Sequence, residues 1–317
     1  MRRFRIRRRR ALAIAILPAA ALLFGTTSGA TAAEPRQAAI DPAKSSVRFG
    51  ERVTLRGHFP GAPGRSVRIQ HRSANGKVFR QVATTRTRQN SRWRARVKPR
   101  GTGMWRARLS SASRSPEPGG EQLLEEPVPV DSETGAKRVQ VRSVTDVRAK
   151  NHTLVGDGVR IRGRVKPGGS RKVLVKVGGK RMKTRADRRG RFDVRWNAGS
   201  TGTFKVRARA RGNARASGSG AKGGRVNVYR KAQASWYGPG FYGNRTACGQ
   251  TLSSGMLGVA HKTLPCGTKL KLRHGAKTVN VKVIDRGPYA GNREFDLTEA
   301  TRNKLGFGHT GTILTSK

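Results

Sequence analysis

The chain has 317 residues, of which 68 are Lys or Arg and 17 are Asp or Glu, so its formal net charge is +51. This length allows several domains, and so basic a chain usually suggests a nucleic-acid partner. No recognised nucleic-acid motif and no ladder of stacking aromatics is present, which argues against that partner. Two cysteines without clustered histidines do not supply a metal site, and we expect no cofactor.

Residues 1–33 have the layout of a secretory signal peptide. Seven arginines fall within the first ten residues, an apolar run follows from Ala11 to Phe24, and Ala30-Thr31-Ala32 offers a small-residue cleavage site. The apolar run is too short to span a bilayer, so a retained membrane anchor is the less favoured alternative. No cysteine stands directly after the segment, so we expect no lipid anchor. We expect a protein secreted to the cell wall, and the arginine bias suggests a GC-rich, Gram-positive bacterium.

The middle of the chain is an internal duplication. Gly57 matches Gly163 at an offset of 106 residues, and Trp93 matches Phe192 at an offset of 99. In each copy, apolar residues alternate with Arg, Lys or Thr, and Gly or Asn-Gly turns separate the short strands. The sequence therefore predicts two immunoglobulin-like β-sandwiches, over residues 34–111 and 138–230.

The stretches between these modules are linkers or loops by composition. Residues 112–137 collect prolines and six of the 17 acidic residues, which is typical of a linker. Residues 212–224 are rich in Gly and Ser and are expected to form a long loop within the second sandwich. The region from residue 234 onward carries only +8, so most of the charge lies in the middle of the chain. Teichoic acid or another anionic wall polymer is one partner for that charge, and a solvated basic surface is the alternative.

Five short motifs follow one another in the last part of the chain. They are ASWYG at 234–238, TACG at 246–249, AHKTLPCGT at 260–268, DRGP at 285–288 and FDLT at 295–298. This series resembles the rare lipoprotein A (RlpA)-like family of the septal-ring lytic transglycosylase type, whose double-psi β-barrel is related to those of barwins and expansins. The resemblance implies a barrel of about six strands with one short helix over residues 231–317, and the chain as a whole is predicted to be all-β.

The residues of this region favour the same barrel. Val279–Ile284 alternates as a strand does, and Asp296 is expected to cap a helix over 297–305. Cys248 and Cys266 are expected to form a disulfide, because an even and sparse count in an exported protein favours pairing.

The resemblance implies an enzyme that cuts peptidoglycan between MurNAc and GlcNAc without water and leaves 1,6-anhydro-MurNAc ends. That reaction needs a carboxyl group to protonate the leaving oxygen and a group to accept the 6-hydroxyl proton. Asp285 is the candidate acid/base, because it ends a strand and precedes a Gly-Pro turn. His261 matches a functional histidine of the family and is expected to assist. The alternatives are a turn-capping aspartate and a structural histidine.

Four further residues are candidates for substrate binding. Trp236 and Tyr237 could stack on sugar rings or belong to the core, and Gln250 and Arg286 could bond to the glycan. Gln250 stands where the family has a glutamate, and an amide cannot carry the proton of a general acid. A non-catalytic glycan-binding or expansin-like wall-loosening module is therefore the alternative to an enzyme.

Overall fold

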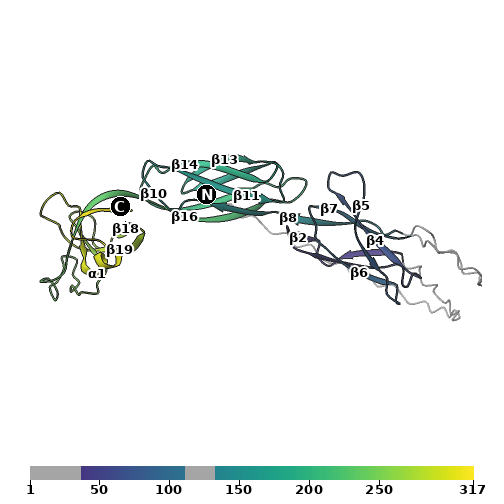
Figure 1. Ribbon diagram of the computed structural model, residues 1–317, viewed down its shortest axis with the longest axis horizontal. Coiled ribbons are helices and arrows are strands. Elements are labelled where there is room, and N and C mark those ends of the chain that lie inside the picture. Colours follow the sequence, from purple (N-terminus) through teal and green to yellow (C-terminus); the bar gives the residue numbers. More distant parts are fainter. Residues whose placement is uncertain (1–36, 111–132) are drawn as a thin grey trace, which may run out of the picture. The chain divides into compact units, whose positions relative to one another are not determined.

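A computed structural model describes residues 37–110 and 133–317 (Figure 1). Almost all of the regular structure is β-strand, with one short helix, so the all-β prediction is confirmed. Three separate clusters of buried apolar side chains organise these strands. The expected signal peptide and most of the expected linker lie outside the described residues. Within the described ranges, no helix has the length and apolar character needed to cross a membrane.

The first module packs two sheets around one core. Leu55 and Ile69, from different sheets, are fully buried in the same cluster, while the residues between buried positions face solvent. One sheet has the order β1 (Ala39–Pro42), β3 (Val53–His58), β6 (Arg92–Val97), and the other has the order β2 (Ser46–Arg48), β8 (Lys137–Arg142), β7 (Gly103–Leu109), β4 (Ser66–Ser73), β5 (Arg80–Arg86).

Strand β8 belongs to the first module, although sequence reasoning assigned residues from 138 onward to the second. β8 pairs with β2 and with β7, and Val139 and Val141 are buried in the first core. Alternation predicts that a segment is a strand, but it does not show which sheet the strand joins. The pairing places β8, which begins at the last residue of the expected linker, within the first module.

The second module repeats the arrangement of two sheets around one core. β16 begins at Ser219, so the stretch expected to be a loop over 212–224 ends in a paired strand. One sheet has the order β14 (Arg191–Asn197), β11 (Gly158–Lys166), β9 (Val144–Arg148), and the other has the order β13 (Lys180–Ala186), β12 (Arg171–Val177), β15 (Gly202–Ala210), β16 (Ser219–Tyr237), with β10 (His152–Leu154) also paired to β16.

One packing detail explains why both copies keep a glycine. Gly57 lies opposite Trp93 across β3 and β6, and Gly163 lies opposite Phe192 across β11 and β14. A Cβ atom would come within 2.6 Å of the Trp93 ring at the first position and within 2.2 Å of the Phe192 ring at the second. Each ring therefore occupies the space beside its glycine, and any side chain there would displace it. That the modules are immunoglobulin-like stays a prediction.

The last region is a closed barrel that uses the second half of β16. Its strands pair in the order β16, β20 (Phe295–Thr298), β17 (Val259–His261), β19 (Lys277–Asp285), β18 (Lys269–His274), β21 (Gly311–Thr315), and β21 pairs back to β16. Leu272, Phe295 and Leu297 are fully buried in its core. The expected strand over 279–284 lies within β19.

The helix of the barrel begins later than its predicted start. α1 spans Glu299–Leu305, and the side chain of Thr298 caps it by accepting a hydrogen bond from the Thr301 amide. Asp296 lies inside β20, two residues before this cap, so the prediction that Asp296 caps the helix was wrong. A side chain that the sequence explained by capping is thereby left for another role.

Candidate functional site

Four strands of the barrel place two carboxyl groups in one cross-strand row. Ser235 of β16 lies opposite Asp296 of β20, Asp296 lies opposite Ala260 of β17, and Ala260 lies opposite Asp285 of β19. Directly opposed residues of neighbouring strands point to the same face of a sheet. The next row holds Leu297, which is buried in the barrel core. The row of acids therefore faces away from that core.

The Asp285 carboxylate is held at the end of β19 by backbone amides. Its Oδ1 accepts hydrogen bonds from the amides of Ala247 and Arg286, each at 2.8 Å. The contact with Arg286 is the turn-capping interaction that the sequence offered as an alternative to catalysis. The contact with Ala247 comes from a loop 38 residues away in the sequence, and it fixes the carboxylate beside that loop.

Asp296 is the acid that sequence reasoning missed. Its Oδ1 accepts a hydrogen bond of 2.7 Å from the Ser235 hydroxyl. Burial raises the pKa of the Asp296 carboxyl above its ordinary value, and the nearby charge of Asp285 adds to the increase. A signal was present in the sequence, because a polar residue between the apolar Phe295 and Leu297 fits one face of a strand as well as it fits a helix cap.

Tyr237 extends the polar face on β16. Burial raises the pKa of its phenol, and the negative charge of Asp285 raises it further, so the hydroxyl stays protonated at neutral pH. Among the described residues no partner forms a well-aligned hydrogen bond with this buried hydroxyl. The ring meets Phe241 edge-on, with centroids 6.2 Å apart. Tyr237 thus offers a proton donor beside Asp285, and most of its ring is covered.

His261 makes a separate polar cluster with Glu294 and Arg230. Its Nδ1 accepts hydrogen bonds from the amides of Thr263 and Leu264, which leaves Nε2 to donate toward Glu294 Oε1 at 3.4 Å. Within the described chain no hydrogen bond or ion pair joins His261 to Asp285. The expected assistance of His261 to Asp285 therefore has no direct contact to support it.

A bidentate ion pair anchors this second cluster. The two terminal guanidinium nitrogens of Arg230 donate to the two carboxylate oxygens of Glu294. The hydrogen bond from Arg230 is the main reason that the pKa of Glu294 is lowered, and the contact with His261 lowers it further. Because both ring nitrogens of His261 are occupied, the cluster positions the turn after β17.

The other predicted binding residues are largely engaged by the protein itself. The guanidinium of Arg302 lies 4.3 Å from the centroid of the Trp236 ring, so it covers one ring face. Arg286 donates to the carbonyls of His261 and Leu264, at 3.3 and 2.9 Å. These contacts fix the turn after β17 against the end of β19.

The loop beside Asp285 is fastened by the disulfide. Cys248 and Cys266 are joined, with their Cα atoms 5.6 Å apart, which confirms the predicted pair. Gln250 lies in the same loop, where its side-chain oxygen accepts from the Thr246 hydroxyl at 3.3 Å. The disulfide therefore ties the loop that contacts Asp285 to the turn that follows β17.

Two aromatic rings on the barrel loops are free to meet a ligand. Phe241, which packs on Tyr237, is 55% exposed, and Tyr289, four residues after Asp285, is 80% exposed. Exposed rings on loops beside polar groups are typical of surfaces that bind sugars or peptides. The sequence pointed to Trp236 and Tyr237 for stacking, because the motif drew attention to β16 and not to the loops.

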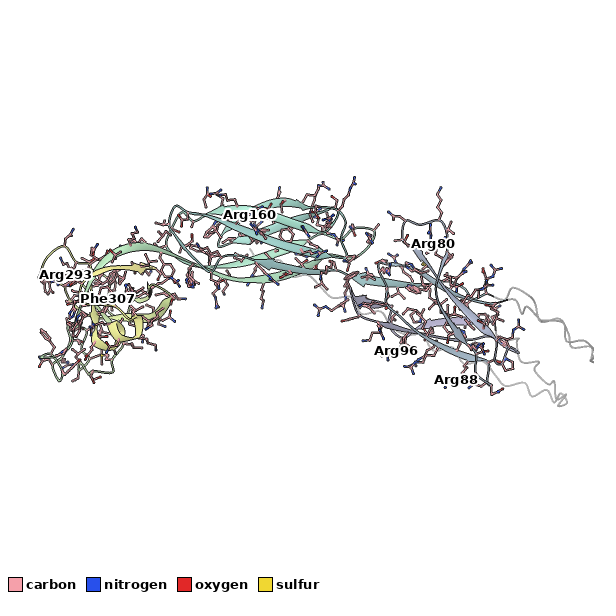
Figure 2. The ribbon with its side chains drawn as sticks, viewed as in Figure 1. Arg80, Arg88, Arg96, Arg160, Arg293 and Phe307 are labelled. Carbon is pink, nitrogen blue, oxygen red and sulfur yellow. A yellow bond between two sulfur atoms is a disulfide. The ribbon has the colours of Figure 1, made fainter. Side chains whose placement is uncertain are left out.

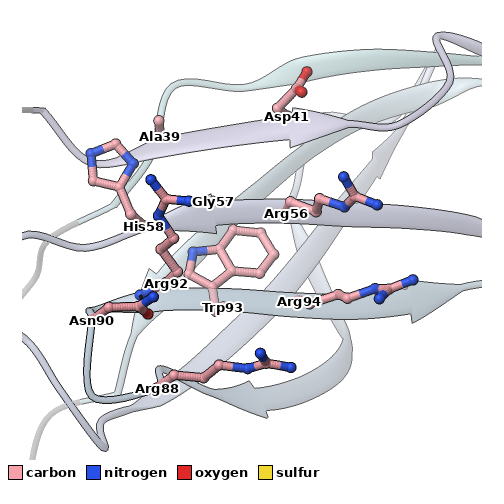
Figure 3. Close-up of a pocket in the computed structure, with 10 residues that line it drawn as sticks. All are labelled: Ala39, Asp41, Arg56, Gly57, His58, Arg88, Asn90, Arg92, Trp93 and Arg94. Atoms are coloured by element: carbon pink, nitrogen blue, oxygen red, sulfur yellow. Dashed lines mark hydrogen bonds between the residues drawn. The ribbon is translucent and has the colours of Figure 1, made fainter.

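A hollow of about 460 Å³ lies on the first module and has no part in the barrel (Figure 3). Figure 3 shows Asp41, Arg56 and Arg94 on three neighbouring strands, with the Trp93 indole beside Gly57. This lining holds one acid among several arginines, which makes it a basic surface without the paired carboxyl groups of the barrel.

The closed barrel of the C-terminal region is similar to a known family of barrel domains. Residues 229–315 match the family model described as lytic transglycolase. The C-terminal region is accordingly an RlpA-like double-psi β-barrel, as the motifs predicted.

Individual relatives match over the same region. The probable endolytic peptidoglycan transglycosylase RlpA of Synechocystis is 46% identical over 81 residues, which is 25% of this chain and 25% of that protein. The endolytic peptidoglycan transglycosylase RlpA of Campylobacter jejuni is 43% identical over 81 residues, which is 25% of this chain and 30% of that protein. The match thus spans less than a third of either relative. Among solved structures, the Streptomyces papain inhibitor matches at 21% identity over 28% of this chain and 94% of that chain, with a TM-score of 0.23.

Proposed function

We propose that this chain is an exported cell-wall protein whose barrel cleaves peptidoglycan glycan strands as a lytic transglycosylase. The observation that carries the proposal is the row that holds Asp285 and Asp296 on one face of a barrel matched by RlpA transglycosylases. The signal-like N-terminus and the disulfide agree with a site of action outside the cytoplasm.

A single carboxyl group can carry both proton transfers that the reaction requires. The bond between MurNAc C1 and the GlcNAc oxygen breaks, and the leaving oxygen takes a proton from a carboxyl group. The MurNAc 6-hydroxyl oxygen then bonds to C1, and its proton passes to a carboxylate, so that no water is consumed. Asp285 is the acid/base in this scheme: it gives its proton to the leaving oxygen and, then ionised, accepts the proton of the 6-hydroxyl. Asp296 lies in the same row, with a carboxyl pKa raised above its ordinary value, and can exchange that proton with Asp285.

Substrate contacts fall on the loops around this row. Phe241 and Tyr289 present rings on which sugars can stack, and the protonated hydroxyl of Tyr237 can donate to a glycan oxygen. His261 holds the turn after β17 through its bonds to the amides of Thr263 and Leu264. It supports the site through that turn and takes no part in the proton transfers.

A second candidate function is glycan binding or wall loosening without cleavage. Gln250 favours it, because the family's glutamate is replaced by an amide that bonds to Thr246 in the same turn. If cleavage depends on Asp285 and Asp296, Gln250→Glu should leave the rate equal or raise it. A chain that binds glycan and gains cleavage only with Gln250→Glu would support this second function.

The test is the chemistry of the products. Purified sacculi are incubated with the full chain, and the released fragments are analysed by mass spectrometry. We expect 1,6-anhydro-MurNAc ends, and Asp285→Asn should lower their formation by about a hundredfold or more. The substitution keeps the side chain's shape, and the unfolding midpoint of the variant serves as the control for folding. Undiminished cleavage by Asp285→Asn would show that another group is the acid/base.

A further inference from the structure

The outer face of one sheet in the second module holds cations and no acids. The strands β13, β12, β15 and β16 contain no Asp or Glu along their whole length. Alternate residues of these strands are buried in the second core, so the residues between them point to solvent. Most of those solvent-facing positions are Lys or Arg.

Register brings four of these cations into a single row. Arg181 lies opposite Lys176, Lys176 lies opposite Arg207, and Arg207 lies opposite Lys222. We call Arg181, Lys176, Arg207 and Lys222 the cation row. Two residues further along the strands, Lys183 and Arg209 flank Leu174 in the next row.

Such an alignment is unfavourable without an anion. Like charges that lie directly opposite on neighbouring strands, with Cβ atoms about 5 Å apart, repel each other. That spacing is shorter than the screening length of about 8 Å at physiological salt, so salt removes only part of the repulsion. In the described part of the chain, no member of the cation row forms a salt bridge. No acid of the described residues therefore supplies the missing negative charge.

Some basic side chains on other sheets of the two modules have an acid beside them. In the first module, Asp41 lies opposite Arg56, which lies opposite Arg94 (Figure 3). In the other sheet of the second module, Arg160 forms an ion pair with Asp193. Arginines such as Arg80, Arg96 and Arg160 extend from the modules (Figure 2), so a basic surface is general. The strands of the larger sheet in the first module also contain no Asp or Glu, but Glu133 beside them forms an ion pair with Arg106. No described acid pairs in this way with the cation row.

A cavity on the same sheet is also lined by cations and by no acid. It has a volume of about 1140 Å³, and no acid contributes to its lining. The cations that line it are Lys172, Lys183, Arg185, Arg209 and Arg211. An anionic polymer bound to the cation row can therefore extend into this positively charged cavity.

We propose that this face binds a linear polymer of phosphodiester groups, such as a polyol phosphate of the cell wall. Four strands spaced by about 4.8 Å make the cation row about 14 Å long, which exceeds the reach of one small anion. Arg181 and Arg207 present guanidinium forks that match phosphate oxygens. The face carries no aromatic side chain on which bases could stack, which favours this polymer over single-stranded nucleic acid.

The test compares two variants of equal charge in the full chain. Lys176→Gln/Arg207→Gln removes an opposed pair from the cation row, and Arg56→Gln/Arg94→Gln removes an opposed pair from the row that contains Asp41. Binding to purified poly(glycerol phosphate) is measured across a series of salt concentrations, with duplex DNA as a second probe. The unfolding midpoint of each variant shows whether it is folded, and the cation-row variant should be at least as stable as the natural chain because repulsion is relieved.

We expect the cation-row variant to bind poly(glycerol phosphate) roughly tenfold more weakly near 0.2 M salt, with a salt dependence smaller by about two charges. The Arg56→Gln/Arg94→Gln variant should bind within about twofold of the natural chain. An equal loss in both variants would overturn the proposal, because net charge alone would then explain binding. Tighter binding of DNA than of the polymer, lost in the same variant, would assign the face to nucleic acid instead.

Discussion

The barrel and the second module use ionisable side chains in opposite ways. All four acids of the barrel have a partner: Asp285 accepts from backbone amides, Asp296 from Ser235, Glu294 from Arg230 and Glu299 from Tyr242. The cation row of the second module has no acidic partner among the described residues. Paired and partly buried groups keep a fixed geometry, which proton transfer requires, whereas exposed like charges act together and from a distance on a charged polymer.

The difference should also appear in the response to salt. Contacts of exposed charges weaken as ionic strength rises, and partly buried pairs are screened much less. The attachment proposed for the second module should therefore weaken with salt, while the arrangement of the barrel site stays nearly unchanged. Each of the following variants tests one side of this contrast.

The largest stability effect is expected from the disulfide. Replacing Cys248 and Cys266 together by serine should lower the free energy of unfolding of the barrel by about 3 kcal/mol, because the loop between them is no longer closed in the unfolded chain. Urea unfolding followed by tryptophan fluorescence measures the change. Binding of poly(glycerol phosphate) should be unaffected, and its loss in this variant would contradict the separation of the two regions.

The ion pair of the barrel should contribute less. Glu294→Gln should cost on the order of 1 kcal/mol at neutral pH, a value reduced because Arg230 and Glu294 are 36% and 32% exposed. The pKa of Glu294 is lowered in the fold, so its contribution is present above the ordinary pKa of a glutamate and is lost as pH falls through the lowered pKa. Unfolding measured from neutral to acidic pH should show the variant and the natural chain converging. A difference that persists in acid would point to packing.

Sugar stacking should depend on the loops and not on β16. Tyr289→Ala should raise KM for sacculi roughly fivefold with kcat nearly unchanged, because the exposed ring contributes to binding alone. Trp236→Ala should instead lower the unfolding midpoint, since its ring is packed against Arg302 and the barrel core. A raised KM for Trp236→Ala with an unchanged unfolding midpoint would show that Trp236 binds the glycan.

A smaller effect with the opposite sign is expected at Asp296. The pKa of its carboxyl is raised in the fold, so the fold loses stability as pH rises from the ordinary value through the raised one. Asp296→Asn should therefore be slightly more stable than the natural chain at neutral pH, by less than about 1 kcal/mol, and equal to it in acid. Thermal unfolding at two pH values measures this, and a less stable variant would show that the Ser235 hydrogen bond outweighs burial.

The sequence was most informative in the C-terminal region, where the five motifs lie. The motifs located the barrel, the disulfide and Asp285 without any knowledge of strand pairing. Asp296 was misread because the same residues fit a helix cap and a strand, and only the position of Thr298 decides between them. Strand β8 and the cation row depend on pairing and register, which follow from contacts between distant segments and are not encoded in local alternation.

The most direct test counts the 1,6-anhydro-MurNAc ends formed per protein molecule bound to teichoic-acid-bearing walls. The natural chain, Asp285→Asn and Lys176→Gln/Arg207→Gln are compared at one salt concentration. If the barrel carries the chemistry and the second module the attachment, Asp285→Asn should bind as the natural chain does and form almost no ends. The cation-row variant should bind less, yet form as many ends per bound molecule. A cation-row variant that forms fewer ends per bound molecule, or an Asp285→Asn chain that still forms them, would contradict this division.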